Sequence, residues 1–158
     1  MIDTTAAAHL YAAGQGTVTH LFADEIAVKE QRPEVDVFEA VLHAGCEPPV
    51  HIHRREDELF YVVSGGITAF VRGEEIPVQE GSLLSMPRGI AHTYAVDTGT
   101  ARVLAMTSPG GFARMFADLA AAFGDDMPAA PGPEAGEIMD PVLDAYGIVM
   151  VAPNPRYS

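Results

Sequence analysis

Short runs of β-forming residues, separated by turn residues, fill the chain between Thr17 and Thr107. The runs are TVTHLF, VDVFEAVLH, ELFYVVSG, ITAFVRG, GSLLSMP, HTYAVD and ARVLAMT. Strands that recur roughly every ten residues, with Gly, Pro or Asp between them, are typical of antiparallel sandwiches and barrels. Residues 64–66, 72–75 and 97–100 have the composition of hairpin turns. The sequence therefore predicts an all-β fold built around one antiparallel β-barrel.

The pattern changes after Pro109, where the spacing of apolar residues becomes helical. At positions i, i+3, i+4, i+7 and i+11, one helical face carries Phe112, Met115, Phe116, Leu119 and Phe123. A shorter helix is expected with Asp140 as N-cap, Pro141 at N1 and Gly147 as its end, and IVMV after it predicts a last strand. We expect three parts: an N-terminal arm at 1–16, the barrel at 17–108, and a C-terminal helix and tail packing on the barrel at 109–158.

The charge balance excludes several classes of partner. The 158 residues carry a formal net charge of −13, whereas nucleic-acid binding needs Lys and Arg to displace counterions from phosphates. Anionic membrane surfaces are disfavoured for the same reason, and no apolar stretch reaches the ~18 residues of a membrane span. The single cysteine, Cys46, cannot form an intrachain disulfide, and no basic residue precedes Lys29 to begin a secretory signal. We therefore expect a cytoplasmic protein that binds neither nucleic acid nor membranes.

Two histidines and a carboxylate lie close together in GCEPPVHIHRREDELFYVVSG, residues 45–65. His51 and His53 are two residues apart, so they share one face of a strand. The charged turn RRED lets the chain reverse, and Glu58 then begins the next strand. Two imidazoles and a carboxylate on neighbouring strands can converge on one point as metal ligands do. For the two histidines alone, ordinary surface positions are the alternative.

A second segment, GSLLSMPRGIAHTYAV at residues 81–96, adds His92 after a PRG turn. Together the two segments resemble the cupin superfamily in both of its motifs. The matching residues are Gly45, His51, His53, Glu58, Gly65, Gly81, Pro87, Gly89 and His92. The chain departs from the second motif at position 96, where Val96 stands in place of an asparagine that is not a metal ligand in the family.

The resemblance implies a small antiparallel β-barrel of jelly-roll type that is usually dimeric and holds a metal ion inside. Carried over residue by residue, the ligands would be His51, His53, Glu58 and His92. Three histidines and a carboxylate suit one divalent transition metal per chain, with Fe, Mn, Ni, Co and Zn as the candidates. A homodimer is expected on the same basis, and a metal-free barrel is the alternative.

Strand parity identifies candidates for the walls of a substrate pocket. The residues that share the parity of Glu58 or of His92 are Phe60, Val62, Tyr94 and Val96. Apolar and aromatic walls favour a flat hydrophobic small molecule over a sugar phosphate.

For the other polar residues near the first motif, we expect ordinary structural positions. His43 ends the strand before Gly45 and is a candidate for the pocket mouth, whereas Cys46 is expected to be a small buried residue. Glu56 and Asp57 compete with Glu58 as ligands, but the motif spacing favours Glu58, and a solvated turn accounts for the other two.

Within the superfamily, the chain is most similar to single-domain quercetin 2,3-dioxygenase-like proteins, in PPVHIHRREDELFYVVSGGI, PRGIAHTY and TSPGGFARMF. The resemblance implies a metal-dependent dioxygenase, an oxidoreductase, acting with dioxygen on an aromatic or enol-bearing small molecule. Glu58 would take the proton of the substrate's hydroxyl group. Two alternatives stay open: a redox-neutral metal-dependent cyclase, lyase or isomerase of a polyketide-like substrate, and a non-catalytic small-molecule-binding cupin.

Overall fold

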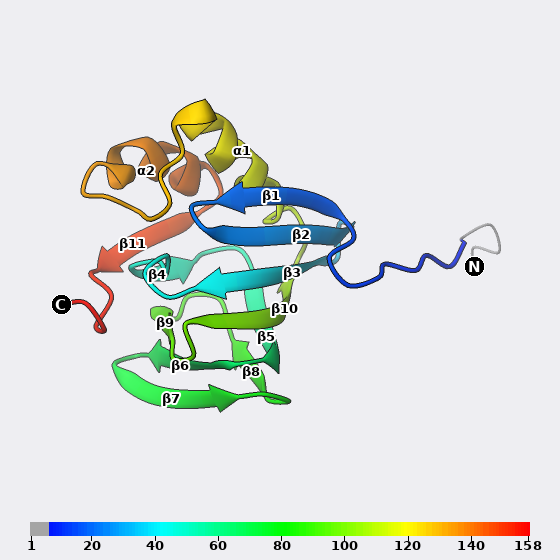
Figure 1. Ribbon diagram of the computed structural model, residues 1–158, viewed down its shortest axis with the longest axis horizontal. Helices are drawn as coiled ribbons and strands as arrows, with labels where there is room; N and C mark the ends of the chain where they lie inside the picture. Colours follow the sequence, from blue (N-terminus) through cyan, green and yellow to red (C-terminus); the bar gives the residue numbers. More distant parts are fainter. Residues whose placement is uncertain (1–6) are drawn as a thin grey trace.

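The computed structural model describes residues 7–158, which form two β-sheets and a C-terminal pair of helices (Figure 1). The strands are β1 (Thr17–Leu21), β2 (Asp24–Gln31), β3 (Asp36–His43), β4 (Val50–His53), β5 (Asp57–Ser64), β6 (Gly66–Val71), β7 (Glu74–Gln79), β8 (Leu83–Met86), β9 (His92–Val96), β10 (Thr100–Ser108) and β11 (Ile148–Ala152). The helices are α1 (Arg114–Phe123) and α2 (Ala135–Ala145), with a 3₁₀ turn at Gly124–Asp126 between them.

Both sheets are antiparallel. The six-stranded sheet has the order β1-β2-β3-β10-β5-β8, and the five-stranded sheet has the order β11-β4-β9-β6-β7. Among the described residues the two sheets share no strand, so they face each other as a jelly-roll sandwich rather than closing into one continuous barrel. The prediction of an all-β jelly-roll fold with a C-terminal helical extension is confirmed.

The core lies between the sheets because the residues of each strand alternate between the inner and the outer face. In β10, every second residue from Ala101 to Thr107 is buried, and β5 shows the same alternation from Glu58 to Val62. In the facing sheet, Ile67 of β6 is fully buried. This period of two is what half-buried antiparallel strands require, and it turns the inward residues of both sheets toward one interior.

Helix α1 packs on the sandwich as its apolar stripe predicted. Met115 and Leu119 are its buried residues, and the helix lies against β1 and α2. Gly124, at φ 61°, ends the helix in a backbone conformation that residues with a Cβ atom rarely adopt. With 10 residues, the helix makes nearly three turns and covers one end of the sandwich, beside β1 in Figure 1.

Helix α2 differs from the expectation. It begins at Ala135 rather than after Asp140, so Pro141 lies inside the helix. The segment AGEIM before Asp140 contains good helix formers, and the burial of Ala135 and Leu143 offsets the backbone hydrogen bond that Pro141 cannot donate.

The last strand, β11, pairs with β4 and so returns part of the tail to the five-stranded sheet. The predicted strand at IVMV is therefore present. The division into an arm at 1–16, a barrel at 17–108 and a tail at 109–158 stays a prediction, and residues 1–6 of the arm lie outside the described residues.

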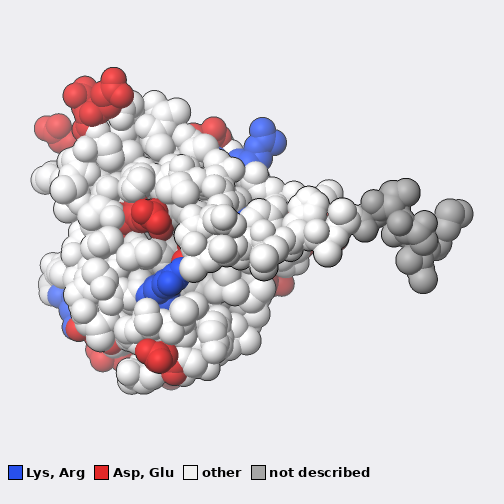
Figure 2. Space-filling model, turned by 45° about the vertical axis from the view of Figure 1, so that its right-hand side comes forward, with Lys and Arg blue, Asp and Glu red and all other residues white. Residues whose placement is uncertain are grey.

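Charged side chains are dispersed on the surface. On the face shown in Figure 2, Lys and Arg are scattered among acidic and uncharged residues, and the described residues there form no continuous basic patch. Within residues 7–158, no helix is long and apolar enough to cross a membrane.

Candidate metal centre

Three strands bring the four predicted ligands together. His51 and His53 occupy the buried, alternate positions of β4, and His92 begins β9 in register with His51. Glu58 is the second residue of β5, on the opposite sheet. The backbone N–H of Gly89 donates to the carbonyl of His53 at 2.8 Å, which ties the PRG turn before β9 to the end of β4.

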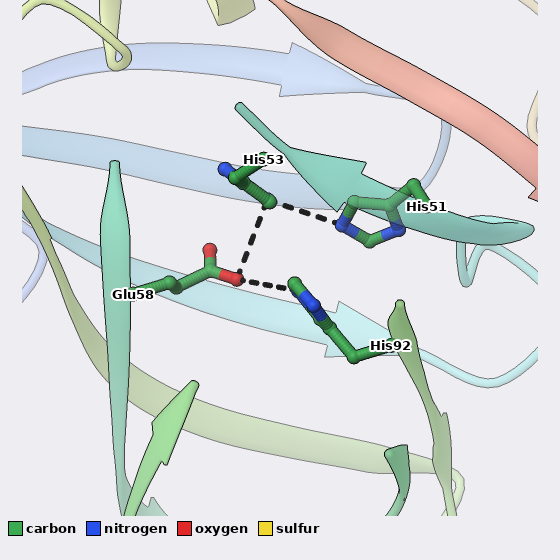
Figure 3. A group of neighbouring side chains, drawn as sticks. All are labelled: His51, His53, Glu58 and His92. Carbon is green, nitrogen blue, oxygen red and sulfur yellow. Dashed lines mark hydrogen bonds and ion pairs between the residues drawn. The ribbon is translucent and has the colours of Figure 1, made fainter. Parts of the chain in front are cut away.

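Figure 3 shows the four side chains pointing toward one another. His51 Nε2 lies 3.2 Å from His53 Nε2, and Glu58 Oε2 lies 3.2 Å from His92 Nε2 and 3.5 Å from His53 Nε2. One potential ligand atom of each residue lies within 4.8 Å of those of the other three. All four residues are buried, the most exposed being His51 at 8%.

The ring nitrogens that face away from the cluster determine what the inward nitrogens can do. His51 Nδ1 lies 2.9 Å from the carbonyl oxygen of Pro49, and His92 Nδ1 lies 2.9 Å from that of Ile90. Because a carbonyl oxygen only accepts hydrogen bonds, we assign the proton of each neutral ring to Nδ1, which leaves a lone pair on Nε2. With the Glu58 carboxylate, the cluster is a set of convergent acceptors, and these residues fit a divalent transition metal ion.

Burial and mutual attraction set the protonation of the cluster. Burial, together with the neighbouring His92 and His53, lowers the pKa of His51 to about 4. Burial opposes ionisation of Glu58, but the charge of His53 and the hydrogen bond with His92 outweigh it and lower the pKa of Glu58. Burial likewise opposes the charged form of His92, yet the hydrogen bond and charge of Glu58 raise its pKa. Without a metal ion, the hydrogen bond between Glu58 and His92 requires a proton on His92 Nε2. Metal binding would release this proton, because a carboxylate and a neutral imidazole are the forms that bind metal ions.

The two other acidic residues of the RRED turn differ from each other. The side chain of Asp57 is about half exposed, at 45%, and forms an ion pair with Arg88, whose Nε lies 3.0 Å from Asp57 Oδ1. This hydrogen bond lowers the pKa of Asp57 to about 2. Glu56 is only 4% exposed, and its Oε2 lies 3.8 Å from His53 Nδ1. The expectation of a solvated Glu56 is wrong, because the turn folds this side chain inward against β4.

An apolar cavity of about 160 Å³ adjoins the cluster, and all four of its residues contribute to the lining. Phe60 and Tyr94 also line it, with their rings edge to face and 5.7 Å between centroids. Val62 and Val96 are buried in the core but outside this lining. Val62 follows Phe60 by two residues on β5, and Val96 follows Tyr94 by two residues on β9. In each pair, the aromatic ring therefore lies between the valine and the cluster.

Both C-terminal helices and the segment just before α1 contribute apolar side chains to the same cavity. These side chains are Phe112, Met115, Phe116, Leu119, Met139 and Leu143. Cys46 is buried at the cavity wall as expected, and burial raises the pKa of its thiol. His43 is outside the lining and instead contacts Asp24, with its Nδ1 3.4 Å from Asp24 Oδ1.

Comparison with known proteins agrees with this geometry. Residues 38–107 match the family described as Cupin domain. This region of the chain is a cupin domain. The matched region runs from β3 to β10 and contains all four residues of the cluster.

This chain has a distant curated relative, quercetin 2,3-dioxygenase from Bacillus subtilis (strain 168). The two are 29% identical over 113 residues, a match that covers 68% of this chain and 33% of the relative. The chain therefore matches about a third of the length of that relative.

Three solved structures share the fold. KdgF from Halomonas sp. matches with a TM-score of 0.62 and 16% identity, over 68% of this chain and 99% of that chain. An RmlC-like cupin from Shewanella frigidimarina NCIMB 400 matches with a TM-score of 0.58 and 20% identity, over 66% of this chain and 93% of that chain. Streptomyces PAC13 was solved with uridine and is described as a nucleoside dehydratase. It matches with a TM-score of 0.53 and 17% identity, over 66% of this chain and 84% of that chain.

Sequence reasoning missed two residues that brace the site. Asn154, 6% exposed, donates from Nδ2 to the carbonyl oxygens of Pro48 and Tyr94 at 3.0 and 2.9 Å. Glu47 accepts from the backbone N–H of Val96 at 2.8 Å. Asn154 lies outside both motifs, and Glu47 occupies a position between Gly45 and His51 to which the motif assigns no residue. The partners Tyr94 and Val96 are far away in the sequence, so spacing carried no signal for either residue.

Proposed function

We propose that this cupin-domain protein is a metal-dependent dioxygenase that acts on an aromatic or enol-bearing small molecule. The observation that carries the proposal is the convergence of four buried acceptors at the end of an apolar, aromatic cavity. The distant relationship to a quercetin 2,3-dioxygenase supports the reaction type.

His51, His53, Glu58 and His92 would hold one divalent ion, with Fe, Mn, Ni, Co and Zn as candidates. When bound, such an ion supplies Lewis acidity toward the substrate's hydroxyl group and, if it is redox-active, an electron-transfer link to dioxygen.

The protein's own contribution is a proton acceptor in a dry site. Glu58 is ionised and nearly fully buried, so its carboxylate can accept the proton of a substrate hydroxyl placed against the cluster. Phe60 and Tyr94 would orient a planar ring beside it, and the apolar side chains of α1 and α2 would exclude water.

A redox-neutral cyclase, lyase or isomerase of a polyketide-like substrate is the second candidate. Its chemistry needs only Lewis acidity and a base, both of which the same four residues would supply. A solved structure with this fold is described as a nucleoside dehydratase, so the fold itself is compatible with redox-neutral catalysis. A barrel that binds a small molecule without turnover is the third candidate.

We also propose a homodimer in the cytoplasm. The outer face of β5 and β8 carries apolar side chains that the chain itself leaves exposed, with Tyr61 at 41%, Val63 at 40% and Leu83 at 57%. Exposed apolar patches of this kind commonly mark interfaces. The expectation of a cytoplasmic location rests on the single cysteine.

Oxygen uptake with a flavonol separates these candidates. Protein loaded with each metal in turn is mixed with quercetin in an oxygen electrode, and flavonol consumption is followed by absorbance. The dioxygenase proposal predicts stoichiometric consumption of oxygen and flavonol with at least one redox-active metal, and none without protein. Turnover of substrate without oxygen uptake would favour the redox-neutral candidate, and tight binding without turnover would favour the binding protein.

A further inference from the structure

The cavity has a second polar end, at Asp24. Asp24 begins β2, is 8% exposed and contributes to the cavity lining. Its Oδ1 accepts a hydrogen bond from the backbone N–H of His43 at 2.7 Å. Within residues 7–158, the other carboxylate oxygen, Oδ2, has no hydrogen-bond partner.

Most other polar side chains in the lining are already engaged. Both oxygens of Glu47 accept hydrogen bonds, Oε1 from the Val96 N–H at 2.8 Å and Oε2 from the Gly45 N–H at 2.7 Å. Cys46 Sγ donates to the carbonyl of Ala129 at 3.5 Å. The hydroxyl group of Tyr94, in contrast, has no partner among the described residues. Outside the four-residue cluster, Asp24 and Tyr94 therefore hold the unused hydrogen-bonding groups of the lining.

The positions of these groups define a direction along the cavity. Tyr94 follows His92 by two residues on β9, so it lies on the same face, one step away from the cluster. Glu58 is in register with Thr107, which pairs with Asp36 at the start of β3. Asp24 contacts His43 at the end of β3.

The two carboxylates thus lie toward opposite ends of β3, and Tyr94 lines the same cavity from the facing sheet. The hydroxyl group of Tyr94 can donate as well as accept a hydrogen bond.

We infer that Asp24 and Tyr94 form a subsite that binds a hydroxyl group on the end of an aromatic substrate remote from the His–Glu cluster. The inference rests on the proposed function, because it assumes that the reacting end of the substrate lies at the cluster. A buried carboxylate selects a hydrogen-bond donor and disfavours carboxylate or phosphate groups at that end. The substrate class is an elongated, neutral, polyhydroxylated aromatic molecule.

Two flavonols test the subsite: quercetin, and the flavonol that lacks the hydroxyl groups of its side ring. Their dissociation constants are measured by fluorescence quenching for the wild type, Asp24→Asn and Tyr94→Phe, with the exposed Asp125→Asn as control. Asp24→Asn keeps one oxygen for the His43 N–H and replaces the other with an N–H donor. We expect the wild type and the control to prefer quercetin by about tenfold or more, and each subsite variant to lose most of that preference.

The outcome of this experiment is independent of catalysis. A wild type that does not prefer quercetin, or an Asp24→Asn variant with an unchanged preference, would overturn the subsite. Oxygen uptake is recorded in parallel, so that a preserved preference without uptake would reject the dioxygenase and keep the subsite.

His53 and Glu56 carry a second, independent observation. Among residues 7–158, His53 Nδ1 and Glu56 Oε2 are buried side-chain atoms without a hydrogen bond, and they face each other at 3.8 Å. In the two other histidines of the cluster, Nδ1 is held by the carbonyl oxygen of the residue two positions earlier. The Nδ1 of His53 faces a carboxylate instead.

We propose that Glu56 is a positioning residue that accepts the Nδ1–H of His53 when a metal ion is bound. This contact would fix the tautomer in which His53 Nε2 presents its lone pair to the cluster, and a carboxylate also raises the basicity of the ring. A shortening of the present 3.8 Å separation by about 1 Å is enough to form the hydrogen bond.

Metal affinity and the hydrogen bond of His53 test this role together. Affinity for Zn²⁺ is measured by competition with a chelator, and ring ¹⁵N shifts of the Zn²⁺-saturated protein report the hydrogen bond at His53 Nδ1. We expect Glu56→Ala to weaken Zn²⁺ binding about 10–100-fold and to change the His53 ¹⁵N shifts. Glu56→Gln, which keeps an acceptor oxygen, should restore the shifts, and the exposed Glu75→Ala should match the wild type. Unchanged affinity and ¹⁵N shifts in both Glu56 variants would overturn the role.

Discussion

His51 illustrates how much of the site depends on single atoms. The hydrogen bond between its Nδ1 and the Pro49 carbonyl turns Nε2 toward Glu58, His53 and His92. The spacing of the sequence predicted which four residues meet, because a period of two along β4 and a reversal before β5 are local properties. It did not predict the burial of Glu56, because whether a charged turn folds inward depends on the packing of distant strands.

Glu58 is the residue on which the proposed chemistry depends most. We expect Glu58→Gln to retain more bound metal than His51→Ala, because the amide oxygen keeps one potential ligand atom. Its turnover should fall by about 100-fold or more, because an amide cannot accept the substrate's proton. Steady-state kinetics on metal-loaded protein measure this, and unchanged turnover would remove Glu58 from the role of base.

Asp24 makes stability depend on pH. Burial raises its pKa to about 6, against the hydrogen bonds from His43, which lower it. Between the ordinary pKa of an aspartate, about 4, and this value, the folded state binds more protons than the unfolded state. The Asp24 contribution to the free energy of unfolding therefore falls as pH rises from about 4 to 6.

The Asp24→Asn variant should lack this dependence. Relative to the wild type, its free energy of unfolding should rise by up to about 2 kcal/mol between pH 4 and pH 6, and then stay level. Urea unfolding at several pH values measures the difference. Parallel stability curves for the two proteins would contradict the assignment.

At the scale of elements, the runs of β-forming residues predicted most of the strands, but they missed β2 and β7. The helices and the tail were harder to predict. Helix α2 begins five residues before Asp140, because tertiary burial of Ala135 overrides the local capping signal. The strand β11 was expected, but its pairing with β4 was not, since pairing between strands so far apart leaves no local pattern. The helical stripe of α1 predicted packing, without indicating that the same residues line the cavity.

The C-terminal tail should stabilise the strands that carry the histidines. Asn154 links the segment before β4 to β9, so Asn154→Ala removes the hydrogen bonds to the carbonyl oxygens of Pro48 and Tyr94, of which Pro48 keeps only the one from the Thr93 hydroxyl group. We expect a loss of about 2–3 kcal/mol in the free energy of unfolding. Denaturant unfolding measures it, with the exposed Ser158→Ala as a control that should stay within about 0.5 kcal/mol. A loss equal to that of the control would show that the tail contributes little to the sheet.

At the scale of the whole molecule, the outer face of β5 and β8 is the proposed dimer interface. Leu83 lies on β8, at the free edge of the six-stranded sheet, in register with Tyr61. Leu83→Lys would bury an unpaired charge there and should raise the dimer dissociation constant by about tenfold or more. Light scattering coupled to gel filtration measures the mass. Ile76→Lys, on the outer edge strand β7, is the matched control, and a monomeric wild type would contradict the proposal.

Metal content tests the proposed metal centre most directly. The wild type, His51→Ala and the exposed control His20→Ala are purified without chelator, and their metals are measured by elemental analysis, with circular dichroism to verify folding. We expect about one divalent transition metal per chain in the wild type and the control. We expect less than about a tenth of that in the folded His51→Ala variant. A wild type that takes up no metal even after reconstitution, or a His51→Ala variant with full metal content, would contradict the metal centre.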